Sequence, residues 1–356
     1  MKKLVLSMAV LALVFTSCNE DQTQELKDEQ SKIDMSDFYV YTDADVDEAN
    51  RAAEGKASCY SMVNLNRQLN KDPKLADKMY DVEYNTRKFL AAKGKPANGG
   101  GPGGGGGSGN TDVLPVDDGF GIVNIPVYVH VVYSNSSENI SNAQVTSQIS
   151  VLNEDFRKTN SDANQLPSEF DNAITDTEIE FTLAGTFRHA NSNTSWGTND
   201  AVKSAYPPVT PETHLNIWVC NIGGGILGYA QFPGGNSSTD GVVVGTQYFG
   251  NTGNVSAPFD KGRTGTHEVG HYLNLRHIWG DGRCRQDDFV ADTPSSDGPN
   301  YGCPSYPTLN CKSNDMTMNY MDYTNDECMY MFSDGQRNRM RAIFAPGGSR
   351  AALAGN

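Results

Sequence analysis

Apolar residues alternate or cluster along four short stretches of this chain, and a further set recurs at helical spacing. The four stretches predict β-strands at 122–133, 179–183, 215–219 and 242–247. Pro126 lies in the first and indicates an edge or an end of the sheet, because proline donates no hydrogen bond to a neighbouring strand. The helical set is Val145, Ile149, Leu152 and Phe156. It predicts a helix that backs the sheet.

Apolar periodicity fades after residue 277, where Cys, Gly, Pro and Asp dominate. Ser333 and Gln336 then have the spacing of a capping box, which predicts a last helix. The pattern indicates an α+β fold, in which a sheet with two helices precedes an irregular half with one helix.

A run of glycines divides the chain. Residues 94–110 contain GGGPGGGGGSG, which predicts a flexible linker that precedes a domain at 111–350. Residues 18–50 are strongly acidic and predict a solvated tether, whereas 51–93 are basic and carry helical apolar spacing around Met62. Because the domain beyond the linker is acidic, the basic segment is expected to dock on it as a pro-segment. A mere spacer is the alternative.

The first residues are typical of an export signal. Lys2 and Lys3 precede an apolar run at 4–15 that is too short to span a bilayer, so residues 1–17 are interpreted as a signal peptide. Removing these lysines takes the formal net charge from -15 to -17. Such a charge disfavours nucleic acid and anionic membranes as partners.

The end of the signal resembles a bacterial lipobox. Phe15-Thr16-Ser17-Cys18 places small residues before a cysteine, and lipidation of Cys18 would anchor the protein at the outer membrane or cell surface. Release to the extracellular space would then follow processing. Ordinary signal-peptidase cleavage near Ser17 is the alternative.

The stretch HEVGHYLNLRH, residues 267–277, indicates a zinc site. On a helix, His267 and His271 lie one turn apart on one face, and Glu268 lies beside the metal without binding it. His277 would be the third ligand only if the chain turns after Asn274, a residue that enters the left-handed conformation at modest cost. Three protein ligands leave one position open, as in catalytic zinc sites. Histidines on a helix face without metal are the alternative.

The stretch at 267–277 and the sequence Asn319-Tyr320-Met321-Asp322-Tyr323 together resemble the metzincin clan, and within it the pappalysin family of zinc endopeptidases. The resemblance covers roughly residues 120–346 and implies the metzincin fold: a twisted mixed sheet, a backing helix, an active-site helix and a disulfide-stapled C-terminal subdomain. It also implies that Met321 forms an apolar floor beneath the histidines. Tyr323 would hydrogen-bond the oxyanion of the scissile carbonyl, the alternative being a packing tyrosine.

Six cysteines remain if Cys18 is lipidated. The family resemblance implies the disulfides Cys284 with Cys311 and Cys303 with Cys328, in the half of the chain that lacks a large apolar core. Cys220 lies in a predicted strand and is interpreted as buried.

Cys59 lies in the predicted pro-segment, where its thiolate would occupy the open position on zinc and keep the enzyme latent. Three alternatives stay open. Cys59 forms a disulfide with Cys220, it is an ordinary free thiol, or an aspartate such as Asp43 or Asp45 blocks the metal instead.

Two acidic features complete the prediction. Relatives bind calcium after the zinc helix, which implies Asp288 and Thr293 as ligands here, although a solvated acidic turn is the alternative. Glu327, just before Cys328, would favour Arg or Lys beyond the scissile bond if it reaches the specificity pocket, and it is otherwise a surface carboxylate.

The predicted function is endopeptidase chemistry on proteins and extended peptides, with Glu268 as general base for a zinc-activated water. The substrate would add as a strand to the edge near 242–247, and the pro-segment would be the inhibitor. The alternative is a surface lipoprotein that binds a partner and holds zinc only structurally.

Overall fold

The structure is a computed structural model and describes residues 33–42, 59–93 and 113–355. The chain divides at residue 36, and the unit that follows, residues 37–356, contains all the helices and strands considered below. The predicted signal peptide, Cys18, Asp43 and Asp45 lie outside the described residues. Within the described residues, no helix is long and apolar enough to cross a membrane.

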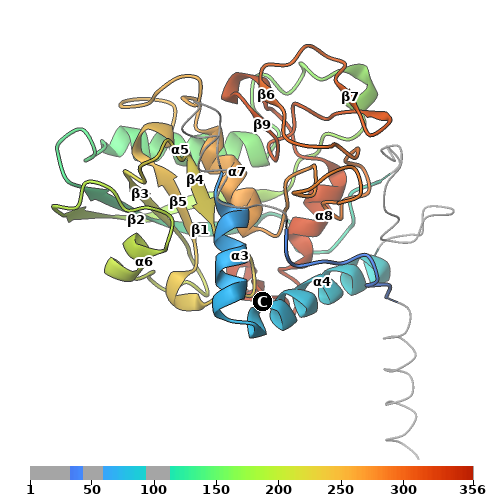
Figure 1. Cartoon of the computed structure of the whole chain (residues 1–356), viewed down its shortest axis with the longest axis horizontal. Helices are drawn as coiled ribbons and strands as arrows, with labels where there is room; N and C mark the ends of the chain where they lie inside the picture. Colours follow the sequence, from blue (N-terminus) through green and yellow to red (C-terminus); the bar gives the residue numbers. More distant parts are fainter. Residues whose placement is uncertain (1–32, 43–58, 94–112, 356) are drawn as a thin grey trace, which may run out of the picture. The chain divides into compact units, whose positions relative to one another are not determined.

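A five-stranded mixed sheet forms the centre of this unit (Figure 1). Its strands run in the order β2-β1-β3-β5-β4, and only β4 is antiparallel to its neighbour. The strands are β1 (Val123–Tyr133), β2 (Ile179–Ala190), β3 (Leu215–Cys220), β4 (Gly228–Ala230) and β5 (Val242–Gly245). The four predicted strands are thus confirmed, whereas the three-residue β4 has no counterpart among the predictions.

Of the two expectations about the sheet edges, that for β5 is wrong, whereas that for Pro126 holds only as the end of a strand pairing. β1 lies between β2 and β3 and is no edge strand, but its pairing with β3 begins only at Val127. Pro126 therefore lies where β1 has β2 alone as a neighbour. On the other side of β1 no strand among the described residues requires a backbone hydrogen bond at this position. β5 is likewise internal, because β4 covers it and forms the actual edge.

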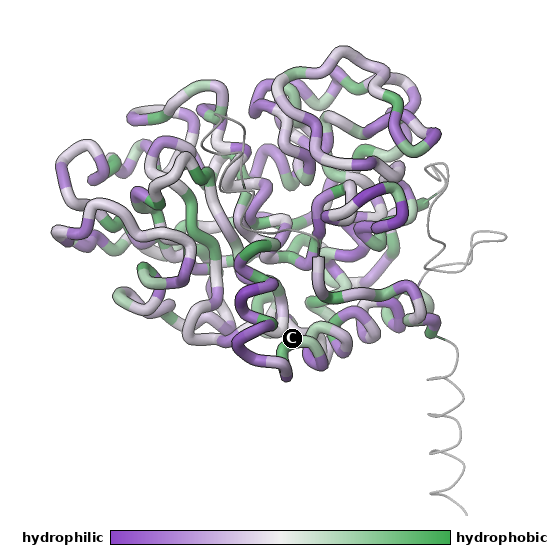
Figure 2. The backbone as a smooth tube through the Cα atoms, viewed as in Figure 1, coloured by the Kyte–Doolittle hydropathy of each residue, from purple (hydrophilic) through white to green (hydrophobic). Residues whose placement is uncertain are grey.

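Helices cover both faces of the sheet. The predicted backing helix is α5 (Asn142–Phe156), which Ser141 caps by accepting a hydrogen bond from the Gln144 amide. α5 packs with the active-site helix α7 (Arg263–Tyr272) over one face, where the main core of apolar side chains lies. The short α6 (Ala201–Ala205) lies at the other face, beside a smaller core around Trp218 and Tyr229. Figure 2 shows hydrophobic positions following the strands between these layers.

The C-terminal half has little regular structure apart from one helix. Its short strands are β6 (Tyr301–Gly302), β7 (Leu309–Asn310), β8 (Ser313–Asn314) and β9 (Tyr323–Thr324). Two disulfides, Cys284–Cys311 and Cys303–Cys328, join these loops in the pairing that the resemblance implied. The helix is α8 (Asp334–Ala342), and the predicted capping box of Ser333 and Gln336 is present at its start. Single 3-10 turns occur at Ser168–Phe170, Ser237–Thr239, Thr246–Tyr248, Asp326–Cys328 and Ala351–Ala354.

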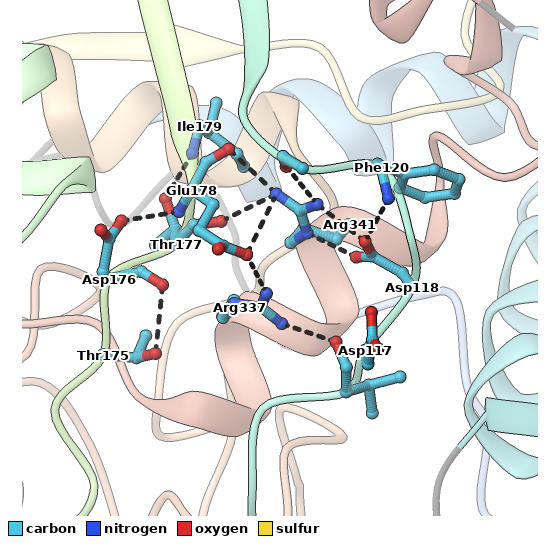
Figure 3. A network of polar contacts seen from close by, with 12 residues as sticks. Asp117, Asp118, Phe120, Thr175, Asp176, Thr177, Glu178, Ile179, Arg337 and Arg341 are labelled. Carbon is cyan, nitrogen blue, oxygen red and sulfur yellow. Dashed lines mark hydrogen bonds and ion pairs between the residues drawn. The ribbon is translucent and has the colours of Figure 1, made fainter.

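An arginine of α8 ties the first residues of the domain to the sheet (Figure 3). Arg341 is buried and donates to both carboxylate oxygens of Asp118, at 2.5 and 2.8 Å. It also donates to the carbonyls of Thr177, Glu178 and Gly121. One side chain therefore links three segments that are far apart in the sequence.

The predicted pro-segment contains two helices, α3 (Ser61–Lys71) and α4 (Lys74–Lys93). α3 confirms the helical spacing around Met62 and contacts β4, whereas α4 packs along α8 (Figure 1). Their shared apolar cluster comprises Met62, Leu65, Leu69, Leu75, Met79 and Phe232. The predicted pro-segment is thus folded against the predicted catalytic domain.

Candidate active site

The active-site helix α7 carries the first two histidines and ends where the sequence requires a turn. Its last residue is Tyr272, and Asn274 adopts a left-handed conformation with φ of 77°. The amide of Leu275 returns a hydrogen bond to the Gly270 carbonyl at 3.0 Å, which closes the helix and redirects the chain. This turn brings His277 back beside the helix, as predicted.

The three imidazoles converge through their Nε2 atoms. Nε2 of His271 lies 3.1 Å from Nε2 of His267 and 3.1 Å from Nε2 of His277. Each Nδ1 is held from behind, that of His267 by the Tyr320 carbonyl at 2.7 Å and that of His271 by the Leu275 carbonyl at 2.8 Å. The Asp281 carboxylate holds Nδ1 of His277. These partners fix each ring with Nε2 facing the common point.

This arrangement fits a zinc ion. Burial lowers the pKa of His267 to about 3 and that of His271 well below its ordinary value, so both rings are neutral at pH 7 and keep a lone pair for a metal. Three imidazole nitrogens at these mutual distances suit tetrahedral zinc with a fourth position to spare.

Glu268 lies beside the three imidazoles and is fully buried. Its Oε2 accepts a hydrogen bond from the Ser61 hydroxyl at 2.7 Å, whereas Oε1 has no hydrogen-bond partner among the described residues. Burial raises the pKa of Glu268 to about 7, against the opposing effect of the hydrogen bonds from Ser61 and Cys59. A carboxyl group with a pKa near neutrality is suited to take up and release a proton.

Two glycines allow the backbone and side chains to approach closely here. A Cβ at Gly228 would lie 2.9 Å from Glu268 Cγ, so only glycine lets β4 pass beside the carboxylate. A Cβ at Gly270 would lie 2.4 Å from the sulfur of Met321. Met321 is fully buried against the zinc helix, which is the place expected for the floor of the site.

Tyr323 lies at the open side of the histidine cluster. Its ring centre is 4.8 Å from that of His277, and its hydroxyl donates to the Cys59 carbonyl at 3.1 Å. The Tyr323 hydroxyl is therefore placed to donate to a backbone carbonyl beside the histidines.

Cys59 lies at the centre of the site. Its Sγ and ligating nitrogens of His267, His271 and His277 lie within 4.8 Å of one another. Cys59 and Cys220 are both buried free thiols, so the alternative disulfide between them is not present. Residue 59 also pairs with Gly228 as a parallel bridge, and the Tyr60 amide donates to the Gly228 carbonyl at 3.0 Å. The predicted pro-segment therefore pairs with the edge strand β4. The strand at which the sequence placed the substrate, β5, is not the edge.

The remaining predicted residues lie apart from the histidines. Asp288 is buried, and both its carboxylate oxygens accept from the Thr293 hydroxyl at 2.9 Å. Glu327 is exposed and does not line the cavity of about 30 Å³ that adjoins His267 and Glu268. The neighbouring Asp326 does line this cavity.

Sequence reasoning missed two residues of the site. Asp281 had a usable signal, because a carboxylate four residues after His277 is placed to orient its ring. Ser61 had none, since its contact with Glu268 joins residues 207 positions apart.

Three buried histidines around one point, with a buried carboxyl group beside them, define a zinc peptidase. A family model described as pregnancy-associated plasma protein-A matches residues 205–345. An extracellular metalloprotease of Arthroderma benhamiae is 33% identical over 229 residues, which are 61% of this chain and 76% of that protein.

Two solved structures from Tannerella forsythia are also similar. Mature mirolysin in complex with a cleaved peptide is 47% identical, with a TM-score of 0.64 over 65% of this chain and 95% of that chain. A promirolysin mutant is 38% identical, with a TM-score of 0.70 over 83% of this chain and 96% of that chain. The chain belongs to the pappalysin family of metzincins and is a zinc-dependent metalloendopeptidase.

Proposed function

We propose that this endopeptidase is made as an exported zymogen, in which residues 51–93 close the active site and Cys59 is the fourth ligand of the zinc ion. The observation that carries this proposal is the position of Cys59 Sγ, within ligating reach of all three histidines. Three imidazoles joined by one thiolate would form a closed tetrahedral site, which leaves no position for substrate.

The pro-segment also occupies the groups that catalysis needs. Ser61 donates to Glu268, and its hydroxyl accepts from the Ala230 amide of the edge strand at 2.7 Å. Tyr323 is bound to the Cys59 carbonyl. The base, the edge strand and the proposed oxyanion donor are therefore all engaged by one stretch of three residues.

Once the segment leaves, the same groups act on a peptide. Bound zinc would supply a Lewis acid that polarises the scissile carbonyl and acidifies a water molecule. Glu268 takes the proton of the attacking water and passes it to the departing amine. Tyr323 donates to the oxyanion, and β4 aligns the substrate backbone as an added strand.

Replacing Cys59 tests the zymogen. Full-length Cys59→Ala should hydrolyse a quenched peptide without prior cleavage, at least tenfold faster than intact wild type, because the fourth ligand is gone. Cys220→Ala is the matched control, since Cys220 is an equally buried free thiol in β3 away from the histidines. Unchanged latency in Cys59→Ala would show that another group blocks the zinc.

Three finer features belong to the same proposal. The relatives named extracellular metalloproteases support export, and the lipobox-like sequence supports a lipid anchor at Cys18. Asp288 and Thr293 would bind a structural calcium ion. A preference for Arg or Lys after the scissile bond would rest on Glu327 or on its neighbour Asp326. Digests of a peptide library by wild type and Glu327→Gln would separate these two carboxylates.

A further inference from the structure

Two arginines of the catalytic region lie together where α4 is docked. Arg276 follows the zinc helix and Arg339 belongs to α8, and both are nearly buried, at 3% and 4% exposure. Their guanidinium carbons lie 5.0 and 5.7 Å from the centre of the Phe289 ring. Two like charges are therefore held over one aromatic ring, in a place with little access to water.

The carboxylate that Arg339 binds comes from the predicted pro-segment, and its charge also acts on Arg276. Glu83 on α4 is 1% exposed and accepts from Arg339 Nη2 at 2.5 Å and from Nη1 at 3.1 Å. Arg87, one turn further along α4, donates to Glu83 at 2.7 Å. Burial opposes the charge on Glu83, but its two arginine partners hold its pKa below the ordinary value.

Apart from Glu83, the two arginines donate only to backbone carbonyls among the described residues. Arg339 Nε donates to the Asn274 carbonyl at 2.9 Å. Arg276 Nη2 donates to the carbonyl of Tyr39 at 2.6 Å, and its Nη1 has no hydrogen-bond partner among the described residues. A small cavity lies against both arginines and Glu83. Withdrawal of α4 would thus leave the buried Arg339 guanidinium without a hydrogen-bonded carboxylate. Arg276 would keep the charge of Asp281 nearby but would lose that of Glu83, so the loss of α4 is costly for both groups.

We propose that Arg276 and Arg339 form a carboxylate-binding exosite on the catalytic domain, and that through Glu83 this exosite keeps the pro-segment bound after the chain is cut in the linker. The inference rests on the proposed role of residues 51–93 as an inhibitory segment. It adds that cleavage and activation are separate events, because the severed segment remains an inhibitor until it dissociates.

In the contact between Glu83 and the arginines, the charges are opposite to those of the segment and the domain as a whole. The segment is basic and the domain acidic, and Arg67 on α3 does pair with Asp200 at 2.6 Å. That arginine is 37% exposed in its side chain, so water and salt weaken the pair. The buried contact has its acid on the segment and its bases on the domain. It is the contact that would make release slow.

The test uses the full chain with a specific-protease site inserted in the glycine-rich linker at 94–110. After nicking, the dissociation constant of the severed segment is measured by size exclusion over a dilution series. Wild type should co-elute and stay latent, whereas Glu83→Gln should bind its segment at least tenfold more weakly. Asp77→Asn is the matched control, because Asp77 is an exposed carboxylate on the same helix and should change binding less than twofold.

A weakening of less than tenfold in Glu83→Gln overturns the exosite. If this variant does not fold, a synthetic peptide of residues 74–93 serves as a competitor against nicked wild type. The same peptide with Glu83→Gln should then need at least tenfold more material to displace the segment, and equal potency of the two peptides would also overturn it. Co-elution is independent of activity, so a Cys59→Ala chain that stayed latent would contradict the role of Cys59 as zinc ligand while leaving this measurement valid.

Discussion

At the scale of single residues, the zinc ligands could be predicted because their chemistry is local. His267 and His271 share a helix face, and the left-handed Asn274 that the sequence suggested does turn the chain so that His277 returns to them. Ser61 could not be predicted, because its role depends on a contact made only when distant segments fold together. Local spacing identifies ligands, whereas the partners of a buried carboxylate depend on the whole fold.

The role of Glu268 gives a prediction at this scale. Glu268→Gln keeps the shape of the side chain and removes the proton acceptor, so peptidase activity in the separated catalytic domain should fall by about 10²–10⁴-fold. Zinc content, measured by atomic emission, should stay equal to wild type because Glu268 is not a ligand. Retained peptidase activity at full zinc content would rule out Glu268 as the base.

At the scale of elements, alternation and helical spacing predicted β1, β3 and α5, whereas a capping box predicted α8, and the structure confirms all four. The sequence did not predict β4, because its three residues, one of them Gly228, are too few to form a recognisable alternation. The edge was therefore assigned to β5, one strand too far in. Apolar patterns reveal which segments are buried, but the order of strands follows from pairings that no single segment encodes.

The link between α8 and the start of the domain gives a prediction about elements. Asp118→Asn removes the charge that Arg341 faces, so the free energy of unfolding in urea at pH 7 should fall by about 3 kcal/mol. Asp117→Asn, an exposed neighbour, should change it by less than about 0.5 kcal/mol. Equal stability of the two variants would show that the ion pair between Asp118 and Arg341 does not stabilise the fold.

The pair of Asp118 and Arg341 also predicts how the free energy of unfolding changes with pH. Despite burial, hydrogen bonds from Arg341 hold the pKa of Asp118 below its ordinary value, so its contribution is present above the unfolded pKa of about 4 and is lost as pH falls further. The stability difference between wild type and Asp118→Asn should therefore shrink in acid. A difference that is constant down to pH 3 would show that the charge is not the cause.

At the scale of the whole molecule, the proposed calcium ion would stabilise the loop that follows the zinc site. Burial raises the pKa of Asp288 well above its ordinary value, and the nearby Asp287 adds to this, so the ionised form lacks a sufficient counter-charge in the protein. A divalent cation would provide it. Calcium at 100 times its dissociation constant should then stabilise the zinc-loaded protein by about 2.7 kcal/mol, seen as a higher Tm in calorimetry. Asp288→Asn should lose this shift and the exposed Asp297→Asn should keep it, whereas an equal calcium shift in all three proteins would place the ion elsewhere.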